Sequence, residues 1–409
     1  MIQGCGLSDA TEIQGEYVLD AWSQALAHEE FYDLITLGNH DEMIDSSVAV
    51  LLEKLQQDEV RGKFVSYNTF ASNGAISQRM VLRTYDSMRL LITGLMYDMS
   101  TAEPLSIINF NKELNTTQFY SMLSAADAVI FLVHIGLNQH REMYDQLYEL
   151  VRSHTSKPVI ILGGHEHQSA YEYGIRTGNS AFVNPFRSKV EDPETGLDMN
   201  VIYMETENYY KNLTLLDFEV KGGMLANVHR ELVQCNKKKL MDIVGIEEET
   251  EFDNAYASEI QKFVDEKVEE LQLLDVIGQS PDNYFFLEPD VHNTSSIWNL
   301  WMQEIVPKVL YEAAEKAKLK NEKVNLIGTS FFNNDIYKGD VNRNDLYVTV
   351  PYLEEFFYDY PEIKGSELKA IFCDMVSSTE YPGCPKAKGP ERLRSPTGFP
   401  KYFLSVDID

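Results

Sequence analysis

The stretch PVIILGGHEHQ, residues 158–168, joins an apolar run to a cluster of polar side chains at its end. The apolar part is short, continuous and rich in Val and Ile, which is typical of a strand buried on both faces of a parallel sheet. Two glycines then allow a tight turn, and two imidazoles follow at His165 and His167. Packing is a poor explanation for two histidines in this position, so the stretch predicts an α/β fold with a ligand-binding edge.

The same pattern occurs twice nearer the start of the chain. YDLITLGNHDE, residues 32–42, ends its apolar run in Asn39 and His40, and AVIFLVHIG, residues 128–136, reaches His134. In α/β folds the carboxyl ends of neighbouring strands converge on one crevice, so we expect these residues to meet the two imidazoles of the first stretch. Each motif alone could be a hydrogen-bonded histidine, a hairpin turn or a helix cap. Three in succession favour a shared site.

Apolar runs and amphipathic segments alternate through the first half of the chain, which predicts layered α/β architecture. The predicted strands are residues 32–37, 90–95, 128–133 and 158–162, and the predicted helices are residues 117–126 and 139–153. Antiparallel strands are predicted at residues 201–207 and 213–220, ahead of a turn at Gly222 and Gly223.

The formal net charge of -29 and the sequence pI near 4.6 argue against a nucleic acid polymer as partner, because phosphate backbones are bound by clustered Lys and Arg. An anionic substrate would need a local positive centre, which bound divalent cations can supply. No apolar run reaches the roughly 18 residues that a membrane-spanning helix needs, so no membrane span is expected.

The 4 cysteines lack the paired spacing of a zinc-thiolate site, and Cys373 and Cys384 either close a local disulfide or remain free thiols. Glycosylation sequons begin at Asn115, Asn212 and Asn293 and indicate exposure to the secretory pathway. The first residues carry neither a basic start nor an apolar core, so no signal peptide is expected in this stretch. Either the protein is cytoplasmic, with Met1 its true start, or the true start is missing.

The second half of the chain begins after an acidic run at residues 247–251. The helix that follows has one apolar face, formed by Ile260, Phe263, Val264, Val268 and Leu271. We expect this helix to connect two domains, although it could be one more helix of a single large domain. The predicted organisation is a domain at 1–245, a linker helix at 246–274 and a smaller α+β domain at 275–409, with a short strand from 276 and a long helix at 296–318 interrupted near Pro307.

The order GNHD, strand-terminal histidine and GHxH resembles motifs three to five of the calcineurin-like metallophosphoesterases. The resemblance implies a layered β-sandwich flanked by helices and two divalent metal ions, Zn, Mn or Fe. It implies that Asn39, His134 and His165 bind one ion and that His167 binds the other. His40 would act catalytically, by stabilising the phosphoryl transition state or protonating the leaving oxygen. In some relatives an Asp three residues later orients this histidine, but Met43 stands there.

Residues 336–371, IYKGDVNRNDLYVTVPYLEEFFYDYPEIKGSELKAI, resemble the signature of the 5'-nucleotidase C-terminal domain. The segment predicts a turn at Lys338 and Gly339, a strand at 346–350, then an aromatic strand, and a helix start at Gly365 and Ser366. The resemblance implies a metal-dependent phosphatase acting on a small phosphorylated substrate, in the first place a nucleotide. The chain is most similar to fungal members assigned to the vacuole, which implies a secretory, vacuolar or extracellular location.

Two family motifs, Asp-x-His and Gly-Asp, are not found before GNHD, so we expect the sequence to be truncated at both ends relative to the family. Asn333 stands where nucleotide-hydrolysing relatives carry a substrate-binding Arg, which leaves the substrate-binding residues unknown. The alternative is a catalytically silent relative that acts as a binding or structural protein. A phosphodiesterase or nuclease is disfavoured by the negative charge.

Overall fold

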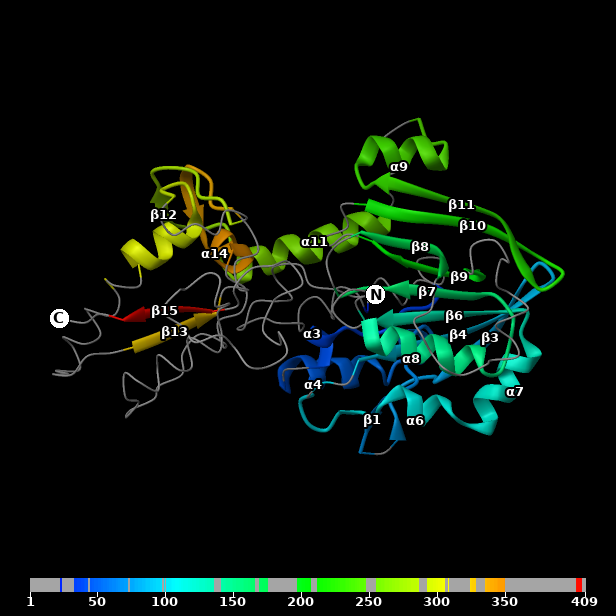
Figure 1. Cartoon of the computed structure of the whole chain (residues 1–409). Helices are drawn as coiled ribbons and strands as arrows, with labels where there is room; N and C mark the ends of the chain where they lie inside the picture. Colours follow the sequence, from blue (N-terminus) through cyan, green and yellow to red (C-terminus); the bar gives the residue numbers. More distant parts are fainter. Residues whose placement is uncertain are drawn as a thin grey trace. The chain divides into compact units, whose positions relative to one another are not determined.

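The computed structural model describes residues 23, 33–42, 45–72, 74–97, 99, 101–135, 141–165, 169–175, 197–206, 212–247, 255–286, 293–305, 308, 324–328, 335–349 and 402–406. These residues divide into two compact units, the first extending to Glu266 and the second beginning at Lys267 (Figure 1). The boundary falls inside the segment 246–274 that the sequence predicts to be a linker. The predicted domain limits themselves stay a prediction.

The first unit is built on a six-stranded sheet with the order β3-β4-β6-β7-β9-β8. Its four central strands run parallel, and β3 and β8 add antiparallel edges. The strands are β3 Met80–Tyr85, β4 Met88–Met96, β6 Ala128–His134, β7 Val159–Gly163, β8 Ala170–Ile175 and β9 Asp198–Glu205. The predictions at 90–95, 128–133 and 158–162 are confirmed, because these continuous apolar runs are buried on both faces of the sheet.

One predicted strand is reduced in the structure. In the described part of residues 32–37, only Ile35 pairs, through a single parallel bridge to Phe64. The chain then enters the short helix α3 Asn39–Glu42 and the helices α4 Asp45–Lys54 and α5 Asp58–Arg61. A small sheet of β1 Thr69–Ala71, β2 Gly74–Ala75 and β5 Ser106–Ile107 completes this part.

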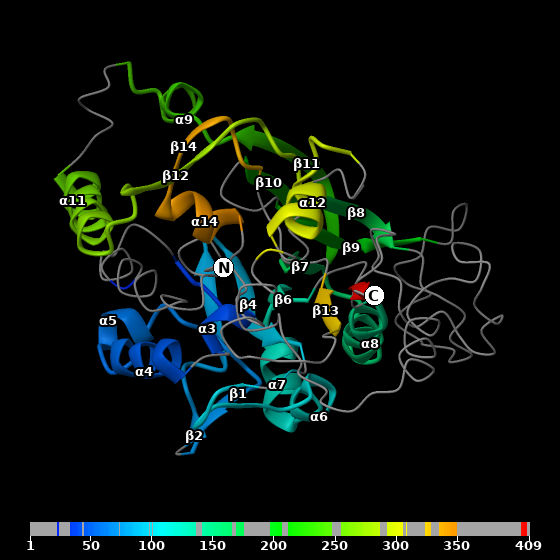
Figure 2. The ribbon, with the colours of Figure 1, turned by 90° about the vertical axis from the view of Figure 1, so that its left-hand side faces the viewer.

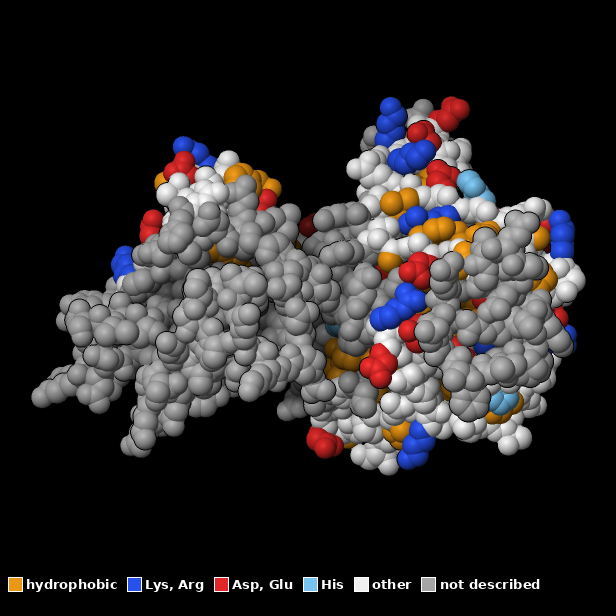
Figure 3. Space-filling view, in the orientation of Figure 1, with side chains coloured by type: hydrophobic (Ala, Val, Ile, Leu, Met, Phe, Trp, Pro, Cys, Tyr) orange, Lys and Arg blue, Asp and Glu red, His pale blue; other side chains and the backbone are white. Residues whose placement is uncertain are grey.

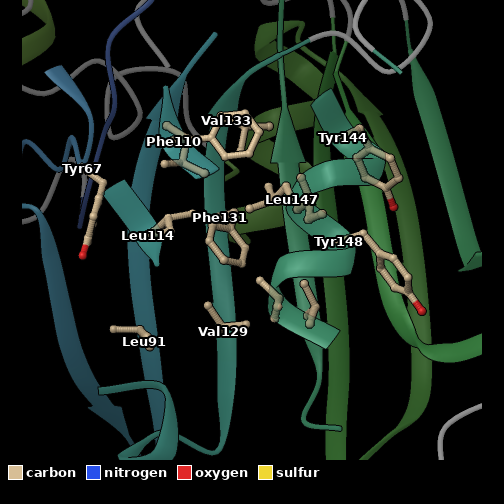
Figure 4. Packing of buried hydrophobic residues seen from close by; sticks show 14 of the residues in the cluster. Tyr67, Leu91, Phe110, Leu114, Val129, Phe131, Val133, Tyr144, Leu147 and Tyr148 are labelled. Atoms are coloured by element: carbon tan, nitrogen blue, oxygen red, sulfur yellow. The ribbon is translucent and has the colours of Figure 1, made fainter. Parts of the chain in front are cut away.

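Helices cover one face of the six-stranded sheet, as Figures 1 and 2 show. They are α6 Phe110–Leu114, α7 Thr117–Ala125 and α8 Arg141–Arg152, which confirms the helices predicted at 117–126 and 139–153. Phe131 and Val133 of β6 pack against Phe110 of α6 and Leu147 of α8 in the core shown in Figure 4.

The opposite face of the sheet is covered by a β-hairpin, which makes the unit a layered sandwich (Figure 2). Its strands are β10 Asn212–Lys221 and β11 Met224–Gln234, and they turn at Gly222 and Gly223 as predicted. Leu216 and Phe218 point inward and pack against a core that includes Ile160 of β7. The short helix α9 Lys237–Val244 follows the hairpin.

A buried ion pair ties helix α8 to strand β9. Arg152 and Asp198 are 0% and 1% exposed, and Arg152 Nε donates to Asp198 Oδ2 at 2.5 Å. Arg152 also donates to the carbonyl of Asn200 at 3.0 Å, and Tyr148 donates to Asp198 at 2.7 Å. Because both charges are paired and hydrogen-bonded, the pair fixes helix against sheet without an unsatisfied buried charge.

In its described residues the second unit contains helical segments and two small antiparallel sheets. Its elements are β12 Val276–Ser280, α12 Ile297–Asn299, the π-helical turn Leu300–Ile305, β13 Val324–Gly328, β14 Gly339–Asn342, α14 Arg343–Thr349 and β15 Tyr402–Val406. Strand β12 pairs with β14, and β13 pairs with β15. Helix α11 Ala255–Glu270 spans the boundary of the two units and confirms the amphipathic helix predicted there.

The strand predicted at 346–350 is wrong, because helix α14 occupies residues 343–349. A reciprocal cap starts this helix: Asp345 N donates to Asn342 Oδ1, and Asn342 N donates to Asp345 Oδ2, both at 2.8 Å. Such a capping box satisfies two backbone donors and overrides the β-rich composition of the segment.

The long helix predicted at 296–318 begins at its cap Ser296, but its described part is the α-helical turn α12 and the π-helical turn up to Ile305. The aromatic strand, the helix start at 365–366, Asn333 and the cysteines at 373 and 384 lie outside the described residues. None of the helices in the described ranges has both the length and the apolar character that a bilayer crossing requires.

Candidate functional site

Three of the predicted site residues meet at the carboxyl edge of the six-stranded sheet. Asn39 begins helix α3, His134 ends strand β6, and His165 follows the neighbouring strand β7 after Gly164. Asn39 Oδ1 lies 2.8 Å from His134 Nε2, and His165 Nδ1 lies 3.2 Å from the same nitrogen. The polar ends of separate apolar runs therefore converge: His134 and His165 because their strands are parallel neighbours, and Asn39 through the start of helix α3.

The cluster is buried and conformationally constrained. His134 is 0% exposed and Asn39 is 8% exposed, while His165 is half-buried. His165 has a φ of 102°, in a region that L-residues rarely adopt, and such strain costs about 1–3 kcal/mol and is concentrated at functional sites. Gly163 precedes it under the Tyr203 ring, where an added Cβ would lie 2.2 Å from the tyrosine hydroxyl. A side chain at 163 would displace this turn.

Two of the three separations among these polar atoms are compatible with ligands of a shared divalent cation. Ligand atoms that hold one ion at about 2.1 Å lie about 3.0–3.4 Å apart, close to the 2.8 and 3.2 Å separations around His134 Nε2. One hydrogen on this nitrogen cannot point at both neighbours, whereas a cation accepts a lone pair from all three atoms. An amide oxygen with two imidazole nitrogens suits Zn, Mn or Fe.

Two predicted site residues are not placed. His40 belongs to helix α3, but its side chain lies outside the described residues, as does the whole of His167. Within the described ranges, no three His, Cys, Asp or Glu side chains are grouped as metal ligands. The described cluster is thus one amide and two imidazoles, and the assigned roles of all five residues stay a prediction.

Asp41 supports the turn that presents Asn39. Its Oδ2 accepts a hydrogen bond from Gly38 N at 2.8 Å, and its own N donates to Gly38 O at 3.1 Å. The side chain is 3% exposed. The Asp41 carboxylate therefore stabilises the backbone turn at which α3 begins.

Glu42 is a buried carboxyl whose environment the sequence does not reveal. It is 0% exposed, Oε1 accepts from Thr69 Oγ1 at 3.1 Å, and Oε2 has no hydrogen-bond partner. The pKa of Glu42 is raised to about 8, mainly by burial; the Thr69 hydrogen bond opposes the rise, and the charge of Asp41 adds to it. Near neutral pH this carboxyl is held mainly in its protonated form.

Tyr97 is a further residue of the cluster that sequence reasoning missed. Its ring centroid lies 5.0 Å from that of His165 and 6.1 Å from that of His134. Burial, followed by the charge of Glu42, raises the pKa of Tyr97. Tyr97 directly follows strand β4, so the rule that residues at strand ends gather at one edge could have found it.

Residues 283–380 match the family model described as the C-terminal domain of NAD nucleotidase. An uncharacterized protein of Schizosaccharomyces pombe is 20% identical over 396 residues, which covers 90% of this chain and 62% of the relative. The chain thus spans less than two thirds of the length of this relative.

Two solved structures share the fold. The 5'-nucleotidase of Candida albicans superposes with a TM-score of 0.71 at 18% identity, covering 99% of this chain and 77% of that chain. The 5'-nucleotidase precursor of Thermus thermophilus gives a TM-score of 0.53 at 16% identity, covering 84% of this chain and 64% of that chain. Together with the family match, these similarities confirm the predicted fold and the resemblance to the 5'-nucleotidase family.

Proposed function

We propose that this chain, whose fold is that of the 5'-nucleotidases, is a metal-dependent phosphatase that hydrolyses phosphate monoesters, with nucleotides as the substrate class. The observation that carries the proposal is the convergence of Asn39 Oδ1, at 2.8 Å, and His165 Nδ1, at 3.2 Å, on His134 Nε2 at the carboxyl edge of the sheet. The match of residues 283–380 to a nucleotidase C-terminal domain supports the substrate class.

In this proposal Asn39, His134 and His165 hold one divalent ion, and His167 contributes to a second. Such ions activate water for attack and neutralise the phosphate oxygens. The chain itself excludes solvent from the inner side of the site, because the proposed ligand His134 is fully buried. It also carries a net charge of -29, so an anionic substrate depends on a locally positive site. On the face seen in Figure 3, described Lys and Arg side chains are scattered among acidic ones.

His40 is proposed as the acid that protonates the leaving oxygen. Helix α3 carries it next to Asn39, and the Asp41–Gly38 hydrogen bonds fix the start of that helix. Met43 cannot orient an imidazole by hydrogen bonding, so the orientation of His40 depends on other neighbours.

We also propose a secretory, vacuolar or extracellular location for this protein. The sequon residue Asn115 is exposed between helices α6 and α7, where a glycan can be carried. Sensitivity of the natural protein to an N-glycosidase, read as a mobility shift, tests this part independently of activity.

Metal content and hydrolysis measured on the same purified protein test the proposed function. We expect Zn or Mn to be bound and both an aryl phosphate and nucleoside monophosphates to be hydrolysed. His165→Ala should weaken metal binding and activity more than about 100-fold, because residues that only support a metal ligand already contribute about 10–100-fold. His229→Ala is the matched control, since His229 is exposed on β11.

Three results separate the candidate functions. Activity that survives His165→Ala would contradict the site assignment. Metal binding without hydrolysis of any phosphate ester would favour the catalytically silent relative. Neither metal binding nor hydrolysis in the wild-type protein would overturn the proposal.

A further inference from the structure

Tyr97 reaches the candidate site from a third neighbouring strand. Strands β4 and β6 run parallel in a register that places Met96 opposite His134. Tyr97 is the next residue after Met96 and therefore lies at the same edge of the sheet, one position beyond the end of β4. Three adjacent parallel strands thus end in Tyr97, His134 and the turn that carries His165.

The backbone that presents Tyr97 is held on both sides. The buried amide of Asn68 accepts from Met96 N at 2.9 Å and donates to Met96 O at 2.8 Å. Its Nδ2 also donates to Ile108 O at 3.0 Å. Further along, Ala102 N donates to Glu42 O at 2.8 Å, which ties the segment after Tyr97 to helix α3. Because the backbone on both sides of Tyr97 is anchored, the position from which its side chain projects is fixed.

The aromatic ring of Tyr97 lies against both imidazoles. It is tilted by 45° to the His165 ring at 5.0 Å and by 27° to the His134 ring at 6.1 Å, while the two imidazoles are 4.9 Å apart at 71°. Aromatic rings attract one another at centroid distances of about 4.5–7 Å. Each ring of the trio therefore restricts rotation of the other two.

We propose that Tyr97 is a positioning residue whose ring holds the His134 and His165 imidazoles in the orientation that binds a divalent cation. The inference rests on the proposed function and deepens it. His165 needs such support, because it is half-buried on a backbone with a strained, positive φ. A pre-oriented pair of ligands binds a cation without first losing rotational freedom.

A purely structural role for Tyr97 is the competing explanation, since the residue also packs at the margins of two apolar cores. The two roles differ in what a substitution changes. Loss of core packing lowers stability throughout the unit, whereas loss of positioning changes the two imidazoles and the metal affinity in protein that is still folded.

The test compares Tyr97→Leu, Tyr97→Phe and the control Tyr120→Leu. Tyr120 is matched because it stacks on another imidazole of the same unit, that of His154, at a centroid distance of 3.7 Å. Zn²⁺ affinity is measured by calorimetry. The relative orientation of the His134 and His165 rings in metal-free protein is measured from NOEs between their ring protons, because removal of an aromatic ring shifts neighbouring resonances by itself. Both readouts use the natural full-length protein, with folding checked by circular dichroism.

We expect Tyr97→Leu to weaken Zn²⁺ binding about 10–100-fold and to weaken or redistribute the NOEs between the two imidazole rings. Tyr97→Phe keeps the ring and should remain close to wild type, as should Tyr120→Leu. Unchanged affinity and unchanged inter-ring NOEs in folded Tyr97→Leu would overturn the proposal. An equal loss in Tyr97→Phe would also overturn it, because the hydroxyl and not the ring would then be responsible.

The proposed function can fail separately from this inference. If the wild-type protein binds no Zn²⁺ and hydrolyses no phosphate ester, the proposed function is wrong. The NMR comparison in metal-free protein then still decides whether the Tyr97 ring orients the two imidazoles: altered NOEs between the two rings in Tyr97→Leu alone support it, and unaltered NOEs refute it.

Discussion

Replacing Glu42 with glutamine should make the stability of this protein less sensitive to pH. Burial raises the pKa of Glu42 from 4.5 to about 8. The native state therefore binds a proton more tightly than the unfolded state, and the free energy of unfolding falls as pH rises from 4.5 to about 8. A pKa difference of about 3.5 corresponds to on the order of 5 kcal/mol lost across that window. Below pH 4.5 this loss is absent, and above pH 8 it is complete.

Urea unfolding of wild type and Glu42→Gln between pH 5 and 9, with a chelator present, measures this difference. Glutamine stays neutral and can still accept the Thr69 hydrogen bond. Near pH 5 the two proteins should have similar stability, and by pH 8 the variant should be the more stable by several kcal/mol. Glu59→Gln, an exposed carboxyl of helix α5, is the control and should change stability by less than about 0.5 kcal/mol. Parallel stability curves for wild type and Glu42→Gln would refute the reasoning.

Two further substitutions test the packing of each unit. Arg152→Met leaves Asp198 buried without its cation and should lower the free energy of unfolding by about 3–5 kcal/mol, whereas Arg141→Met, in a partly exposed pair, should cost less than about 1 kcal/mol in the same urea titration. Equal losses would contradict the assigned role of burial. Asn342→Ala removes half of the reciprocal cap of α14 and should destabilise that helix by about 1 kcal/mol, seen as faster amide exchange across residues 343–349. Unchanged exchange there would show that the cap does not start the helix.

The sheet could be predicted because each of three central strands corresponds to a continuous apolar run of residues. The runs at 90–95, 128–133 and 158–162 are apolar along their whole length, and only a strand or helix buried on all sides accommodates such a run. The meeting of His134 with His165 follows from topology, since the parallel neighbours β6 and β7 end at one edge. Asn39 joins them from the start of helix α3, because the run before it forms only a single bridge and no strand of the sheet.

The rest depended on contacts between distant segments, which a local pattern does not contain. The composition of residues 346–350 predicts a strand, whereas the cap that Asn342 forms with Asp345 begins helix α14 there. The sequence around Glu42 does not distinguish it from an exposed acidic residue, whereas the tertiary structure buries it against Thr69. The position of Tyr97 depends on Asn68, which is distant in the sequence and whose amide hydrogen-bonds the backbone of the preceding residue, Met96.

The distance along the chain between the residues of the candidate site has a consequence for how the molecule matures. Asn39 and His134 are separated by 95 residues, yet their side chains touch across 2.8 Å. Contacts of such long range require the slow closure of large loops, so they form late in folding. A partly folded chain therefore lacks the assembled cluster of Asn39, His134 and His165. Under the proposed function, metal binding would have to follow completion of the sheet.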